Sequence, residues 1–146
     1  MTREILRGSV LTCEAVQAAL IETVAAEPTV VAAYLFGSLA RGTAGPRSDV
    51  DVGLLVGDRR EGEAACERTM DALCRRLRTS HVDVVPLADA PLPLRYRVVR
   101  DGSLVVCRDA WAVERFVTET VLQYLDFKPL RDRALEIVRD AVLENR

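Results

Sequence analysis

Apolar residues recur at helical spacing in four stretches of the chain. In the first stretch, Val16, Leu20 and Val24 are four residues apart and therefore share one helix face. Thr12 precedes this stretch and is a suitable N-cap. Near the end of the chain, Pro129 divides two stretches that follow each other closely. The spacing predicts helices over residues 12–26, 61–78, 110–125 and 129–144.

Shorter apolar runs bounded by glycine, proline or turn residues predict the strands. Such runs occupy residues 29–36, 49–56, 81–87 and 104–107. Between residue 94 and the last of these strands, the pattern suits a short helix or an extended piece. Helices and strands mixed in this order predict an α/β or α+β domain built of packed layers. We expect residues 1–146 to form a single domain, because that length suits one core.

Composition narrows the class of protein. The net charge of −2 provides no overall basic field, so strong nucleic-acid binding is not expected. No stretch has the length and apolar content of a membrane span, and the N-terminal residues do not form a signal peptide. We therefore expect no membrane partner and a cytoplasmic location.

The cysteines offer little chemistry. None of the four is in C-x-x-C spacing with another, and His81 is the only histidine, so a zinc site is poorly supported. Each cysteine has apolar neighbours, which predicts a small buried hydrophobic residue at each position.

One candidate for phosphate binding follows the strand predicted over residues 29–36. Gly37 lets the backbone approach a ligand closely, and free N–H groups with the Ser38 hydroxyl suit phosphate oxygens. Taken alone, a Gly-Ser pair after a strand is more often only a turn.

Two carboxylates stand at the start of the next predicted strand. Asp49 and Asp51 are two residues apart and share a face, while Val50 and Val52 point into the core. A pair of carboxylates suits Mg²⁺, which prefers oxygen ligands. An Asp-x-Asp pattern is also common in solvated turns, and taken alone it favours that interpretation.

A third carboxylate, Asp83, lies among valines in the strand predicted over residues 81–87. In a mostly buried strand a carboxylate is costly unless it is paired or bound to metal, although an edge position facing water is equally consistent. Together, three acids on one sheet face beside a phosphate-ready turn predict a two-metal site acting on phosphorus.

The motif in residues 36–51 resembles a known signature. Residues 36–42, FGSLARG, followed by Asp49-Val50-Asp51, are similar to the pattern of polymerase-β-type nucleotidyltransferases, in which ten residues separate a Gly-Ser from an Asp-x-Asp. Asp83 matches the third family carboxylate. The small size and residues 124–130, YLDFKPL, resemble the MNT-type minimal nucleotidyltransferases, the antitoxin partners of HEPN-domain ribonuclease toxins. The resemblance is specific in residues 36–51 and looser after residue 85.

This resemblance implies a small mixed sheet flanked by helices, here with two C-terminal helices. It also implies ATP as donor, two Mg²⁺ ions, and transfer of AMP to a tyrosine of a HEPN-domain toxin. By the same resemblance, Gly37 and Ser38 would hold the β and γ phosphates. Asp49 and Asp51 would bind both metals, and Asp83 would complete the metal site and help to deprotonate the acceptor hydroxyl.

Three nearby side chains are weaker candidates. Arg41 and Arg47 lie near the expected phosphate loop and suit contacts to the triphosphate or acceptor, although Arg47 is at least as well explained as a solvated arginine. His81 is two residues from Asp83 and would share its face, but an ordinary sheet histidine is more common.

Two other functions remain open. In the first, the chain neutralises a toxin by binding alone, and its catalytic site is vestigial. In the second, it is a stand-alone transferase that acts on a small molecule or an RNA end. Intact Gly37-Ser38 and all three aspartates favour catalysis over binding alone. No separate acceptor-binding domain is evident, so we expect a partner protein to supply the rest of the acceptor site.

Overall fold

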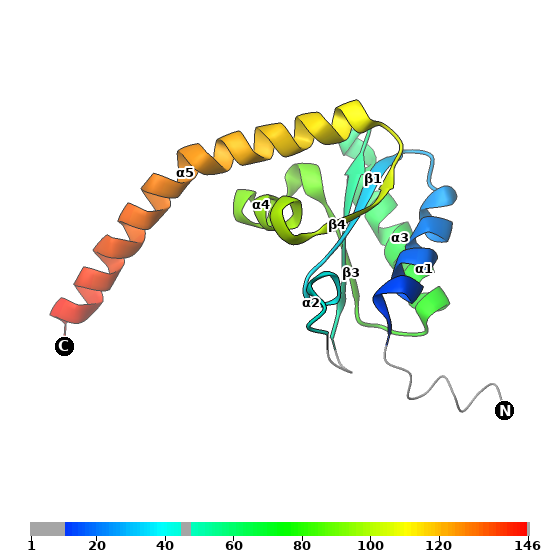
Figure 1. The fold of residues 1–146 in the computed structure, drawn as a ribbon, viewed down its shortest axis with the longest axis horizontal. Helices are drawn as coiled ribbons and strands as arrows, with labels where there is room; N and C mark the ends of the chain where they lie inside the picture. Colours follow the sequence, from blue (N-terminus) through cyan, green and yellow to red (C-terminus); the bar gives the residue numbers. More distant parts are fainter. Residues whose placement is uncertain (1–10, 45–47, 146) are drawn as a thin grey trace.

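The computed structural model describes residues 11–44 and 48–145, which form one sheet with helices against both faces (Figure 1). The strands are β1 (Val30–Phe36), β2 (Val50–Val56), β3 (Val82–Pro86) and β4 (Ser103–Cys107). The longer helices are α1 (Cys13–Ala25), α3 (Gly62–Leu77), α4 (Leu92–Asp101) and α5 (Ala110–Glu144). Three short turns of helix complete the order: α2 (Ser38–Arg41), η1 (Arg59–Glu61) and η2 (Leu87–Asp89).

The sheet is mixed, as the sequence resemblance implied. Its strand order is β3-β2-β1-β4, with β1 antiparallel to both neighbours and β2 parallel to β3. The C-terminal end of β1 therefore lies beside the N-terminal ends of β2 and β3. Every candidate acid lies at this end of the sheet.

Alternation along β1 explains its unbroken apolar run. Ala33 and Leu35 pack on the side of α1 and α3, whereas Ala32, Tyr34 and Phe36 pack on the side of α4 and α5. Because successive strand residues point to opposite faces, a strand covered by helices on both sides needs apolar residues at every position.

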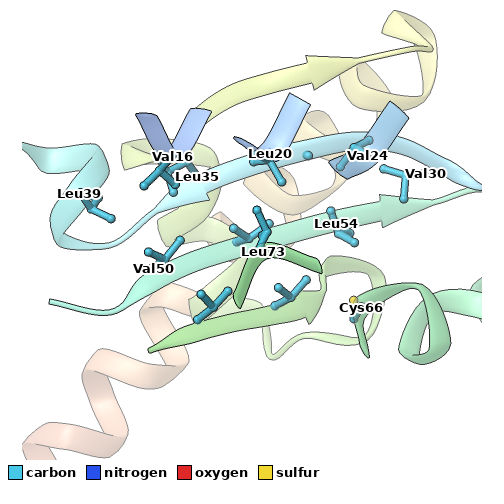
Figure 2. Close-up of a cluster of buried hydrophobic side chains, with 14 residues drawn as sticks. Val16, Leu20, Val24, Val30, Leu35, Leu39, Val50, Leu54, Cys66 and Leu73 are labelled. Carbon is cyan, nitrogen blue, oxygen red and sulfur yellow. The ribbon is translucent and has the colours of Figure 1, made fainter. Parts of the chain in front are cut away.

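The larger core lies between the sheet and helices α1 and α3 (Figure 2). Val16, Leu20 and Val24 are fully buried on α1, as their spacing predicts. The hydroxyl of Thr12 accepts a hydrogen bond from the Ala15 backbone nitrogen at 3.1 Å and caps this helix, which confirms the predicted N-cap.

The opposite face is covered by α4 and by the first half of α5. Val98 on α4 and Val113 and Phe116 on α5 are buried there against Tyr34 and Phe36 of β1. Beyond Tyr124, no residue of α5 within the described part of the chain is buried. The predicted apolar stripe at Leu130, Ala134, Ile137 and Ala141 does exist on the helix, but its side chains are exposed.

The prediction of two separate C-terminal helices over residues 110–125 and 129–144 is wrong. A single helix, α5, runs through Pro129, and Figure 1 shows that it bends in its middle. Proline removes one backbone donor and crowds the preceding turn, so it bends a helix that other interactions hold together. One such interaction spans the proline: Arg131 donates a hydrogen bond to the Tyr124 hydroxyl at 2.7 Å.

The cysteines are all free and only partly follow the prediction of burial. Cys66 lies in the larger core, and burial, with smaller effects from Glu63 and Asp83, raises the pKa of its thiol to about 11. Cys13 and Cys74 are half-buried. For Cys107 the prediction is wrong, because this residue ends the edge strand β4 and is exposed.

Among the helices of residues 11–44 and 48–145, none combines the length and the apolar character that crossing a membrane requires.

Candidate functional site

Three neighbouring strands place Phe36, Asp51 and Asp83 in one row. Phe36 of β1 pairs with Asp51 of β2, and Asp51 pairs with Asp83 of β3. Residues paired on adjacent strands point to the same face, and adjacent strands lie about 4.8 Å apart. The parallel register of β2 and β3 therefore sets two carboxylates side by side.

This row points toward α4. Val50 and Val52 on β2, and Val82 and Val84 on β3, all belong to the core on the side of α1 and α3. The alternate residues Asp51 and Asp83 must then point to the other face of the sheet.

Asp83 is exposed, so of the two positions that the sequence left equally open, the edge position facing water is the one observed. Since β3 is the edge strand, one side of its carboxylate is open to water. The cost of burial therefore gives no reason for an acid here. The remaining structural reason for an acid at this position is the strand register, which places Asp83 beside Asp51.

Asp49 stands one residue before β2 and contacts His81, which stands one residue before β3. The Val50 backbone nitrogen donates to the His81 carbonyl oxygen at 2.8 Å, which extends the pairing of the two strands. The Asp49 Oδ1 and His81 Nδ1 atoms are 3.3 Å apart, and both side chains are mostly exposed. His81 thus lies closer to the acids than the sequence analysis favoured.

The charges of the other candidate groups act on Asp51. Its pKa is raised above the ordinary value, first by burial, then by the charges of Asp83 and Asp49, while Arg41 opposes the rise. All three carboxylates and Arg41 therefore lie within mutual electrostatic reach.

Gly37 makes room for the Asp51 carboxylate. Its φ of +77° belongs to the region that favours glycine, and a Cβ at this position would lie 2.3 Å from Asp51 Oδ2. The glycine therefore has a role that the sequence analysis did not foresee, since its missing side chain lets the chain turn directly over an acid. Ser38 follows at once and begins α2, one helical turn that was not predicted.

The turn after Gly37 closes on itself. The Arg41 backbone nitrogen donates to the Gly37 carbonyl oxygen at 3.1 Å, and the Thr43 nitrogen donates to the Ser38 carbonyl oxygen at 2.9 Å. These bonds fix Ser38 next to Asp51 and leave the Arg41 side chain exposed. Arg47, the other arginine named from the sequence, lies outside the described residues.

The structure adds a charged group on α4 that sequence reasoning missed. The pKa of Asp101 is held below its ordinary value, first by hydrogen bonds from Arg100 and then by the charges of Arg100, Arg41 and Arg97, while burial opposes the change. Arg97 therefore lies in the same region as Arg41. Arginines in a helical stretch are too common for the sequence alone to identify this one.

The carboxylates do not form a closed ligand set as they stand. Within residues 11–44 and 48–145, no group of three or more His, Cys, Asp or Glu side chains is placed to hold a metal ion. Asp49 is turned toward His81 instead. The chemistry of the donor set nevertheless fits Mg²⁺, because the donors are hard oxygens. The 62% exposed Asp49 side chain also has room to change rotamer.

Comparisons with known proteins agree with this arrangement. A family model described as "Polymerase beta, Nucleotidyltransferase" matches residues 18–110, which contain all four strands and the three acids. A search of curated protein sequences gives no match.

Similar folds occur among solved structures of toxin–antitoxin systems. A chain from a toxin–antitoxin crystal structure with AMP-PNP is 26% identical, with a TM-score of 0.73 over 84% of this chain and 97% of that chain. A chain from the tri-AMPylated Shewanella oneidensis HEPN toxin in complex with MNT antitoxin is 23% identical, with a TM-score of 0.69 over 87% and 98%. A chain from a toxin–antitoxin MntA–HepT structure is 22% identical, with a TM-score of 0.64 over 86% and 97%. The last two likenesses establish the fold alone.

The matched family, the row of acids and the glycine turn coincide in one part of the molecule. The family model spans residues 18–110 of the 146, which is more than half of the sequence. This chain belongs to the polymerase beta nucleotidyltransferase family.

Proposed function

We propose that this protein transfers AMP from ATP to a tyrosine hydroxyl of a HEPN-domain toxin and so acts as its antitoxin. The observation that carries the proposal is the convergence of Asp49, Asp51 and Asp83 beside the Gly37-Ser38 turn. Acids gathered on one face beside a glycine turn suit phosphoryl transfer, because they can hold the cations that balance the charge of the phosphates.

The reaction is a displacement at the α-phosphorus of ATP. The tyrosine oxygen forms a bond to this phosphorus while the bond to the oxygen bridging to the β-phosphorus breaks, and pyrophosphate leaves. The hydroxyl proton passes to a base, for which Asp83 is the candidate because it is exposed at the sheet edge. The products are a tyrosine–AMP phosphodiester and pyrophosphate.

The chain's own residues would bind the metal and position the phosphates. Asp49 and Asp51 would hold Mg²⁺, which when bound supplies the positive charge that the phosphates need. The backbone at Gly37 and Ser38 would position the phosphates. Arg41, and with it Arg97 from α4, would contribute charge from the other side of the turn.

The solved relatives suggest the nucleotide and the acceptor. The chain that is 26% identical comes from a toxin–antitoxin structure with AMP-PNP, an ATP analogue, which supports ATP as the donor. The Shewanella oneidensis structure contains a HEPN toxin carrying AMP groups together with an MNT antitoxin, and it suggests the acceptor. We place the activity in the cytoplasm.

The test begins with the gene beside that of this chain, where we expect a HEPN-domain protein to be encoded, and uses that protein as the acceptor. A substoichiometric amount of the chain, with ATP and Mg²⁺, should raise the intact mass of this HEPN protein by whole AMP units and abolish its ribonuclease activity. Peptide mapping should place the AMP on tyrosine. An unchanged mass after full inhibition would refute the proposed chemistry.

Neutralisation by binding alone is a second candidate, and two observations favour it. The three acids are not preformed as a metal site, and the second half of α5 exposes a broad apolar surface that catalysis does not need. Binding alone would require stoichiometric protein and would be indifferent to ATP. A stand-alone transferase would instead modify a small molecule or an RNA end and leave the HEPN protein unchanged.

A further inference from the structure

The second half of α5 has an apolar surface that nothing in the described chain covers. Every residue from Asp132 to Asn145 is exposed. The exposed fraction is 71% at Leu130, 61% at Ile137 and 59% at Val138. The first half of the same helix, in contrast, buries Val113 and Phe116 against the sheet. We call residues 130–144 the C-terminal arm.

The apolar residues of the C-terminal arm lie on one side. At 3.6 residues per turn, the arc that they occupy is about 160° wide, and every charged residue of the arm except Arg131 lies outside it. The apolar arc comprises Leu130, Ala134, Leu135, Ile137, Val138, Ala141 and Val142. Leu143 is also 56% exposed but falls on the charged side. An arc this wide suits packing into a groove, because the contact between two helices of a coiled coil uses a narrower strip of each helix.

Contacts at the bend hold the C-terminal arm in a defined direction. The ring of Tyr124 on α5 stacks on Tyr96 of α4, with centroids 3.7 Å apart and an interplanar angle of 4°. Arg131, at the start of the arm, lies over the Tyr124 ring at 5.4 Å, and Arg100 lies over Tyr96 at 5.7 Å. Tyr124 thus ties α5 to α4 just before Pro129, and Arg131 ties the start of the arm back to Tyr124, so the arm projects from a fixed base.

The C-terminal arm projects from the body of the molecule on the side of the sheet that α4 covers. In Figure 1, α5 passes over α4, bends and runs outward, so that its last turns stand apart from the sheet, at about the height of α2 in this view. Asp51 and Asp83 also point to the α4 face of the sheet. A protein that rests on the arm can therefore reach the acids on the same face.

The dimensions of the C-terminal arm argue against a second copy of the chain as its occupant. An arc of about 160° on a helix about 22 Å long and 11 Å across offers roughly 340 Å². Stable interfaces bury about 800 Å² on each side. Two arms alone fall short of this area, so a stable partner must contact a further surface as well, and the α4 face that carries Asp51 and Asp83 is the surface that an acceptor has to reach.

From these observations we infer that the C-terminal arm docks the acceptor protein, with its apolar arc seated in an apolar groove of that protein. The inference rests on the proposed function, because the acceptor must be a protein. The arm holds the acceptor while its tyrosine reaches the acids, so docking and transfer use separate surfaces.

The test compares two variants that place the same charge on opposite sides of the arm. Ile137→Asp disrupts the apolar arc, and Leu143→Asp is the matched control on the charged side. Calorimetry measures the Kd for the HEPN-domain protein encoded by the neighbouring gene. We expect Ile137→Asp to weaken binding by about 30-fold or more, as at an interface hot spot, and Leu143→Asp by less than about 3-fold. Both variants should melt, and bind ATP with Mg²⁺, like the wild type.

Each other result has a definite meaning. If both variants bind the HEPN protein as tightly as the wild type while AMP transfer proceeds, docking lies elsewhere and the proposed function stands. If Ile137→Asp abolishes binding but the wild type adds no AMP, docking stands and the proposed chemistry fails. A wild-type chain that does not bind the HEPN protein overturns both. A dimer of the free chain that Ile137→Asp dissociates, seen by light scattering, would replace the acceptor with a second copy.

Discussion

The acid end of the sheet and the C-terminal arm of α5 differ in what the chain leaves incomplete. At the acid end, strand register places the carboxylates side by side, and uncompensated negative charge gathers around Asp51. On the arm, helical periodicity places the apolar side chains on one side, and their surface is left exposed. Under the two proposals, a cation and a nucleotide complete the first region, and the surface of the acceptor protein covers the second. The comparison shows that regular spacing identifies the residues that share a face, even before the molecule that binds to that face is known.

The largest expected effect belongs to the acid end. Asp51→Asn should lower the rate of AMP transfer by about 10³-fold or more, because a metal ligand contributes several kcal/mol at the transition state. Without metal, the same variant should melt at the wild-type temperature or higher, since it removes one charge from beside Asp83 and Asp49. Transfer kinetics and thermal melts in EDTA check the two parts. A large fall in melting temperature would make Asp51 a structural residue.

The two halves of α5 should respond differently to truncation of an apolar side chain. Phe116→Ala removes a side chain that is 8% exposed in the core and should lower the free energy of unfolding by about 3 kcal/mol. Ile137→Ala, at 61% exposed, should change it by less than about 0.5 kcal/mol. Urea unfolding of the free protein measures both. Similar losses would mean that the C-terminal arm packs against the chain in solution.

Gly37 and Gly42 both have a positive φ, but ψ is −155° at Gly37, in a region open essentially to glycine alone, and 16° at Gly42, in the left-handed helical region. Gly37→Ala should cost about 2 kcal/mol in unfolding free energy and should disable transfer, because the added Cβ would overlap the Asp51 carboxylate. Gly42→Ala has a φ of +72° and no atom within 4 Å of the added Cβ, so only backbone strain of about 1 kcal/mol should remain. Unfolding and transfer assays on both variants test this contrast. Equal loss of transfer would show that crowding at Asp51 is unimportant.

The fold was largely predictable, because buried strands and amphipathic helices carry regular patterns. The four strands and the helices α1 and α3 match the predicted stretches to within about two residues at the ends, and α4 is the short helix that the sequence offered as one of two alternatives. Pro129 misled the analysis because a local rule predicts a break, whereas a contact between Tyr124 and Arg131 bridges it. The one-turn helix α2 is too short to show any periodicity.

The candidate site was predictable in part. The spacing of Gly37-Ser38 and Asp49-Val50-Asp51 was enough to name these positions, and the strand register then brought Asp83 beside Asp51. For Asp83 the sequence left a buried and an edge position equally open, since a sequence does not say which strand lies at the edge. Arg97 was missed for a similar reason, because only tertiary packing brings α4 close to Arg41.

The central claim is that the acids beside Gly37 form a metal-dependent nucleotide site, and an ATP titration tests it most directly. Calorimetry on the free chain should show ATP binding with Mg²⁺ and little or none in EDTA, because three carboxylates and a triphosphate repel each other. The Asp49→Asn, Asp51→Asn double variant should lose most of the Mg²⁺-dependent binding while keeping its fold. Equal affinity for ATP with Mg²⁺ and in EDTA would contradict the account.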